Sequence, residues 1–166
     1  LLKIEKDKAY SNIALDSAVR ELSLDSTDCA FISRLVYGVT ERKLTLDFVI
    51  SQFLNQPIKK LKAEVLVILR IGTYQILYMD KIPDSAAVNE SVTLAKNNKS
   101  SYASGVVNAV LRKVSLEREN VFKSLSGDER LSVLYSAPID LVRFLKHHYN
   151  EENAEEILKS ALNKKE

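Results

Sequence analysis

One face of the segment 104–114 carries residue types that suit contact with a nucleic-acid backbone. Gly105, Asn108 and Arg112 are spaced three and four residues apart, so on a helix they overlie one another. The other face is apolar at helical spacing, with Val107, Val110, Leu111 and Val114. A core helix needs only the apolar stripe. The polar line therefore indicates either a solvated helix face or a surface that approaches another backbone, such as RNA phosphate.

Basic side chains are concentrated around this helix. Residues 96–118 contain five Lys or Arg against Glu117 alone, and residues 42–62 contain five against Asp47 alone. Residues 119–166 hold nine acids and seven bases. The net charge of +2 does not by itself indicate nucleic acid, but the distribution predicts a basic surface and a separate acidic one.

If this surface contacts RNA, we expect the contact to consist of phosphate-binding cations and one amide that makes a directed hydrogen bond. These residues are Lys96, Lys99, Asn108, Arg112 and Lys113. The alternative is that Asn108 and Arg112 tie helices together. Tyr102 is the one aromatic residue near this set, so binding is expected to depend on charge and shape more than on stacking.

The sequence offers little for catalysis or for cofactors. The glycines at 38, 72, 105 and 127 are too scattered for a phosphate-binding loop or an ordinary S-adenosylmethionine loop. Cys29 lies in an apolar helical pattern and is interpreted as a small buried hydrophobe. His147 and His148 are adjacent, so on a helix they diverge and share no metal face. We therefore expect no catalytic residue, no cofactor site and no metal site in this chain.

Two charged residues have open interpretations. Arg70 lies in an apolar helical segment, where its guanidinium must be paired or must extend outward. Glu90 lies away from the apolar positions of its segment and faces either solvent or a partner.

The chain is expected to be all-α, because Gly and Pro are few and no alternating β-branched run occurs. The segment 1–5 is expected to end a helix, and a weak helical segment at 121–135 is expected to be interrupted by Gly127. The segment 62–80 is apolar almost all round, which is typical of a buried central helix. The other predicted helices are 10–22, 28–42, 44–54, 84–97, 105–118, 139–149 and 151–162. We expect one domain at 1–135 and a helical connector at 136–166.

The predicted location is the cytoplasm. A single cysteine excludes an internal disulfide framework and suits a reducing compartment. The apolar run 65–79 is too short, and too interrupted by Arg70 and Gln75, to cross a membrane. We interpret the chain, which begins at Leu1, as a piece of a longer protein.

Five segments in register carry a family resemblance: LVYGVT at 35–40, TLD at 45–47, LRIGTYQILYM at 69–79, IPDSAAVNESV at 82–92 and GVVNAVLR at 105–112. Together they resemble the NusB-like RNA-binding domain at the N-terminus of RsmB/Sun-type 16S ribosomal RNA cytosine-5 methyltransferases. The tail segments SAPIDLVRFL at 136–145 and HYNEENAEEI at 148–157 resemble the helices that connect that domain to the methyltransferase.

The resemblance implies an all-α NusB-like bundle of two small helical groups that positions small-subunit ribosomal RNA and is itself non-catalytic. It also implies a methyltransferase domain of the same protein as partner, with S-adenosylmethionine bound there. The basic N-terminal helix of such domains is reduced here to Lys3, Lys6 and Lys8. One alternative is a NusB-type transcription antitermination factor that binds RNA and a ribosomal protein. Another is a helical protein-interaction module without an RNA role.

Overall fold

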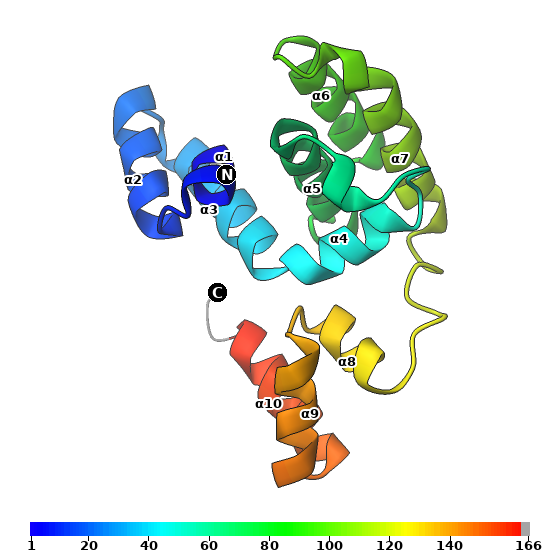
Figure 1. Ribbon diagram of the computed structural model, residues 1–166. Helices are drawn as coiled ribbons and strands as arrows, with labels where there is room; N and C mark the ends of the chain where they lie inside the picture. The colour runs from blue at the N-terminus through cyan, green and yellow to red at the C-terminus, as the bar shows by residue number, and fades with distance from the viewer. Residues whose placement is uncertain (164–166) are drawn as a thin grey trace.

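The computed structural model describes residues 1–163, which form helices joined by turns and loops, without a strand in that range (Figure 1). This confirms the predicted all-α fold. The α-helices are α1 (Leu2–Asp7), α2 (Ser11–Leu22), α3 (Ser26–Glu41), α4 (Lys43–Ser51), α5 (Ala63–Tyr78), α6 (Asp84–Lys96), α7 (Ser104–Glu117), α8 (Gly127–Leu134), α9 (Ile139–His148) and α10 (Glu151–Asn163). Two short 3₁₀ turns, η1 (Ile58–Lys60) and η2 (Ser101–Ala103), precede α5 and α7. Within the described residues, no helix is both long and apolar enough to cross a bilayer.

Most helix ends lie within two residues of the predicted ones, and two local details differ. The helix predicted at 44–54 ends at Ser51, where the backbone tightens into short-range bonds such as Phe53 N–H to Ile50 C=O at 3.1 Å. The prediction that Gly127 interrupts a helix is wrong. Gly127 instead begins α8 with a φ of 56°, a left-handed conformation that glycine adopts at low cost.

The central helix of the larger group is α5, as its apolar sequence predicts. Its buried residues occur on every side, because α1, α3, α4, α6 and α7 all pack against it. Gly72 permits the close approach of α6 and α7. A Cβ at this position would lie 2.5 Å from Leu111 Cδ1 and 2.8 Å from Ser91 Oγ. The two helices of the predicted RNA surface are therefore seated directly on the buried helix.

Arg70 is the charged residue of this buried helix, and it is paired. Its Nε and Nη2 atoms donate to the two carboxylate oxygens of Asp47 at 2.6 and 2.7 Å, and Nη1 donates to Glu5 at 3.0 Å. Glu5 also accepts from Lys43 at 3.0 Å. These contacts fasten α1 and α4 to α5.

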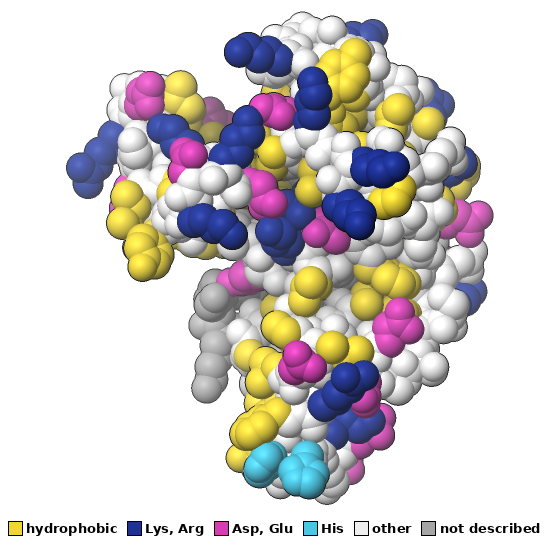
Figure 2. Space-filling view, viewed as in Figure 1, with side chains coloured by type: hydrophobic (Ala, Val, Ile, Leu, Met, Phe, Trp, Pro, Cys, Tyr) yellow, Lys and Arg dark blue, Asp and Glu magenta, His cyan; other side chains and the backbone are white. Residues whose placement is uncertain are grey.

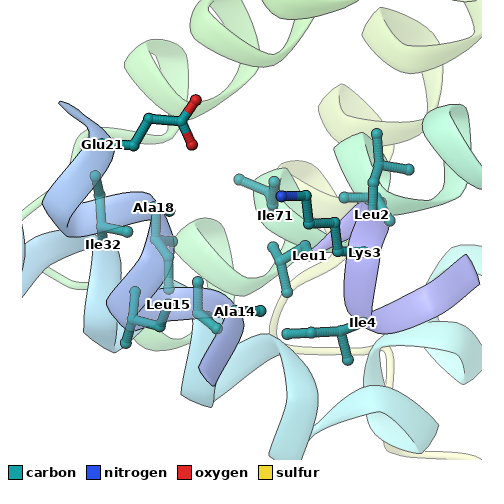
Figure 3. Close-up of a pocket in the computed structure, with 13 residues that line it drawn as sticks. Leu1, Leu2, Lys3, Ile4, Ala14, Leu15, Ala18, Glu21, Ile32 and Ile71 are labelled. Atoms are coloured by element: carbon teal, nitrogen blue, oxygen red, sulfur yellow. The ribbon is translucent and has the colours of Figure 1, made fainter. Parts of the chain in front are cut away.

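An apolar cavity of about 620 Å³ lies between the first helices and α5 (Figure 3). Leu1 and Ile4 of the N-terminal segment face Leu15 of α2 and Ile71 of α5 across it. The helices α1 to α3 are thus packed more loosely on α5 than α6 and α7 are.

The helices α8, α9 and α10 form a smaller group below α4 in the view of Figure 1. Their shared core consists of Leu131, Ala137, Val142, Leu145, Ala154 and Leu158. Two hydrogen bonds join this group to α4. Leu44 N–H donates to Ser136 Oγ at 3.1 Å, and the Thr45 hydroxyl donates to the Val133 carbonyl. The predicted connector at 136–166 thus packs with α8; its residues 164–166 lie outside the described residues.

Candidate nucleic-acid interface

The α6 and α7 helices pack against each other and run antiparallel on the larger group (Figure 1). A cavity of about 340 Å³ lies between them. It is lined by Asp84, Ser85, Val88 and Asn89 from α6 and by Arg112, Ser115 and Leu116 from α7. This cavity and the adjoining exposed residues of α6 and α7, as far as Lys96 and Gly105, are called the α6–α7 groove.

Asn108 and Arg112 are joined to each other on the α7 side of the groove. Arg112 Nε donates to Asn108 Oδ1 at 2.9 Å. The bond runs within one helix, so it does not tie two helices together. The bond fixes the direction of the guanidinium. The two terminal nitrogens of Arg112 make no hydrogen bond to any residue in 1–163. Those nitrogens are therefore available to an anionic ligand.

Gly105 leaves the groove open one turn before Asn108. It is exposed, and a Cβ at this position would meet nothing within 4 Å. The glycine is therefore not required by packing, in contrast to Gly72. A ligand backbone can approach α7 at this point without a side chain in its way.

Lys96 and Lys99 lie at the end of the groove where α6 connects to α7. Lys96 is the last residue of α6, seven residues after Asn89, so it lies in line with the groove-facing edge of that helix. Lys99 follows in the connection. Both side chains are exposed, and neither has an ion pair among the described residues.

Lys113 lies on a neighbouring face of α7. It follows Arg112 directly, and is therefore about 100° further around the helix. It is exposed and carries no ion pair within residues 1–163. Of the five predicted residues, Arg112 lines the cavity and Asn108 is bonded to it, while Lys96 and Lys99 lie at the other end of α6 and Lys113 lies on a neighbouring face of α7.

Arg118, another cation of residues 96–118, is already engaged in ion pairs within the protein. Its Nη1 lies 3.4 Å from Asp84, whose other oxygen accepts from the Ser115 hydroxyl at 2.6 Å. Arg118 also lies 3.9 Å from Asp80. The acidic end of the groove is therefore neutralised within the protein, which leaves its cationic character to Arg112 and the lysines.

Lys62 also belongs to this region, which sequence reasoning missed. It precedes α5, and its Nζ lies 5.0 Å from the centroid of the Tyr102 ring in η2. Lys59 and Lys60 lie in η1 just before it. The surplus of cations in 42–62 is visible in the sequence, but the contact of Lys62 with the α6–α7 connection is not. Figure 2 shows Lys and Arg side chains around this end of the molecule.

The residues that could do other chemistry remain apart. Cys29 is half-buried, with its thiol 3.7 Å from the Leu24 carbonyl. The His148 ring packs on Phe144, with 4.2 Å between ring centroids. Among residues 1–163, no three His, Cys, Asp or Glu side chains are arranged to hold a metal ion. Glu90 is exposed on α6.

The sequence was compared with known proteins. The NusB family profile matches residues 1–116. A probable ribosomal RNA small subunit methyltransferase B of Bacillus subtilis is 35% identical over 95% of the chain, and one of Synechocystis is also 35% identical over 95%. The chain spans 35% of the length of each of these relatives. A transcription antitermination protein NusB of Ruminiclostridium cellulolyticum is 38% identical over 69% of the chain and 80% of its own length.

The comparisons confirm the resemblance recognised from the five sequence segments. The profile match covers α1 to α7, which is the whole of the larger helical group, and the methyltransferase relatives extend the likeness into α8, α9 and α10. The chain is therefore a member of the NusB family.

Proposed function

We propose that this chain is an RNA-binding domain that positions small-subunit ribosomal RNA for a methyltransferase domain of the same cytoplasmic protein. The observation that carries the proposal is the α6–α7 groove, where Arg112 and Lys96 offer cationic groups without a carboxylate partner among residues 1–163. The similarity to a ribosomal RNA methyltransferase, 35% identical over 95% of the chain, supports this choice of RNA.

Each proposed contact has a distinct task. Lys96, Lys99 and Lys113 are point charges that neutralise phosphates. Arg112 presents a planar group that can bind a phosphate through two donors. Asn108 holds Arg112 in place through its Oδ1 atom and keeps its NH₂ group for a ligand acceptor.

The RNA proposal is tested by titrating the chain into labelled fragments of small-subunit ribosomal RNA and following fluorescence anisotropy. We expect binding that weakens steeply as salt is raised, because phosphate contacts release counterions. Absence of binding at low salt would contradict the proposal and would favour a module that binds only protein.

The second part of the proposal is that the chain carries no catalytic residue and no cofactor site, and that S-adenosylmethionine binds elsewhere in the whole protein. The observation behind it is the position of the four glycines, none of which forms a phosphate-binding loop. Calorimetry with S-adenosylmethionine is expected to give no heat of binding. Saturable binding to the chain would overturn this part.

An antitermination adaptor is the second candidate function. It is favoured by the identity to a NusB protein over 69% of the chain. The helices α9 and α10 favour the first proposal, because the likeness to the methyltransferases extends through them. Capture of a small ribosomal protein by the purified chain would favour the adaptor. A methyltransferase sequence in the reading frame after residue 166 would favour the first proposal.

A further inference from the structure

We propose that Tyr102 and Lys62 form a subsite that stacks one unpaired nucleobase at the end of the α6–α7 groove. This inference rests on the proposed RNA-binding function and specifies which part of the RNA is held there. It also differs from the expectation from the sequence, where Tyr102 is the one aromatic residue near the predicted RNA contacts and binding depends mainly on charge and shape.

The Tyr102 ring is exposed to solvent. It is 62% exposed and lies in η2, three residues after Lys99 and three before Gly105. The hydroxyl group makes no hydrogen bond with any residue in 1–163. The ring therefore takes no part in the hydrophobic core clusters of residues 1–163.

Lys62, the residue just before α5, approaches the ring. Its Nζ lies 5.0 Å from the ring centroid, which is within the range of a cation–π contact. A cation on one face of the ring, combined with an exposure of 62%, leaves ring surface open to a second flat group. A nucleobase is such a group, because each base has a π-face that stacks on tyrosine.

The charge around the ring suits a phosphate backbone. Residues 91–116 contain no Asp or Glu, and neither do residues 48–63. The two stretches contain Lys96 and Lys99, which precede Tyr102 in the connection, and Lys59, Lys60 and Lys62, of which Lys62 contacts the ring. Proteins that bind single-stranded RNA combine an aromatic ring, on which a base stacks, with nearby cations that bind the phosphates.

The tyrosines of the core show what a structural ring looks like in this fold. Tyr74 is 7% exposed, and its ring occupies the space that a Cβ at Gly38 would need. Tyr102 makes no comparable contact and does not belong to the hydrophobic core clusters of residues 1–163. Its replacement should therefore leave folding unchanged, which makes the subsite testable.

The test uses a fluorescein-labelled twelve-residue oligouridine and the same strand paired with oligoadenosine. The variants are Tyr102→Leu, Tyr102→Phe and Lys62→Gln, with Tyr149→Leu as control, because Tyr149 is a half-exposed tyrosine on the smaller helical group. We expect Tyr102→Leu to weaken single-strand binding roughly tenfold, while Tyr102→Phe and Tyr149→Leu stay within about twofold of the parent. Tyr102→Leu should leave the salt slope unchanged, and Lys62→Gln should lower it by about 0.7.

The outcomes separate this inference from the function on which it rests. If the parent chain binds oligouridine with a strong salt dependence and Tyr102→Leu binds equally well, the stacking subsite is wrong and the RNA-binding function stands. If the duplex binds as tightly as the single strand, the subsite is also wrong. If the parent chain binds neither these probes nor ribosomal RNA fragments, both proposals fall. Loss of a protein partner with unchanged RNA affinity would assign Tyr102 to a protein contact instead.

Discussion

Arg70 and Asp47 form a two-bonded ion pair between the central helix and α4, with a guanidinium side chain that is only 5% exposed. The carboxylate of Glu5 completes the pairing from α1, 65 residues away in sequence. These contacts thus fasten α4 and α1 to α5. Their loss would affect the frame of the bundle more than the α6–α7 groove.

Asp47→Ala should destabilise the protein strongly, because it leaves a buried guanidinium with only Glu5 as partner. Removing one member of a buried pair costs about 3–5 kcal/mol. Urea denaturation measures the change in the free energy of unfolding. Asp47→Asn, which keeps the size and one acceptor, should lose less. Equal stability of Asp47→Ala and the parent would show that the pair does not hold α4 to α5.

Glu5 should make part of the stability depend on pH. Burial raises its pKa, but hydrogen bonds and charges from Lys43 and Arg70 outweigh this effect and hold the pKa below the ordinary value of 4.5. A carboxyl group with a depressed pKa in the folded state stabilises that state above its unfolded pKa. The contribution is lost as pH falls through the folded value. Glu5→Gln should therefore be less stable than the parent at pH 7, and the difference should shrink below pH 4.5.

Urea midpoints of the parent and Glu5→Gln between pH 7 and pH 3 test this expectation. All other carboxyl groups are the same in the two proteins, so the difference between their free energies of unfolding reports the titration of Glu5. A difference that stays constant across this range would show that the Glu5 charge does not stabilise the folded state.

Gly72→Ala and Gly105→Ala should change stability in opposite directions, although both glycines are helical. The Cβ at residue 72 would meet Leu111 and Ser91 below 3.0 Å, and overpacking of this kind costs about 1–3 kcal/mol. The Cβ at residue 105 meets nothing within 4 Å, and alanine favours a helix over glycine by about 0.5–1 kcal/mol. Thermal unfolding of the two variants, compared with the parent, measures both changes in stability. If Gly105→Ala binds RNA as the parent does, no ligand backbone passes close to that position.

Truncation after residue 135 should destabilise α8. The division into 1–135 and 136–166 stays a prediction, but Leu131 of α8 shares its core with Val142, Leu145 and Leu158 of α9 and α10. Hydrogen exchange should therefore show less protection of α8 in a 1–135 chain than in the full chain, while α5 keeps its protection. Unchanged protection of α8 would mean that it folds with α4 alone.

The sequence predicted helices and burial better than partners. The apolar surround of α5 identified the central helix, because hydrophobic periodicity reports burial directly. The same pattern required a partner for Arg70 without naming it. Asp47 and Glu5 are distant in sequence, and their pairing follows from how the helices pack.

The candidate site shows the same limit. The groove-facing line of Gly105, Asn108 and Arg112 is a local helical pattern, and the structure keeps it on one face of α7. The contact of Lys62 with Tyr102 joins residues 40 positions apart and depends on how the start of α5 lies against the α6–α7 connection. The sequence groups Lys113 with Arg112 among the cations of consecutive helices, but neighbouring residues on a helix point in different directions.

The most direct test of the account is the salt dependence of binding to single-stranded ribosomal RNA. A triple variant, Lys96→Gln with Lys99→Gln and Arg112→Gln, is compared with a control triple variant, Arg20→Gln with Lys123→Gln and Lys159→Gln, at cations outside the groove. The slope of log K against log salt should be smaller by about 2 in the groove variant, since each phosphate contact contributes about 0.7. The control variant should keep the parent slope, and both variants should keep the parent melting temperature. Equal slopes in the two variants, or a groove variant that melts early and keeps the parent slope, would contradict RNA binding by the α6–α7 groove.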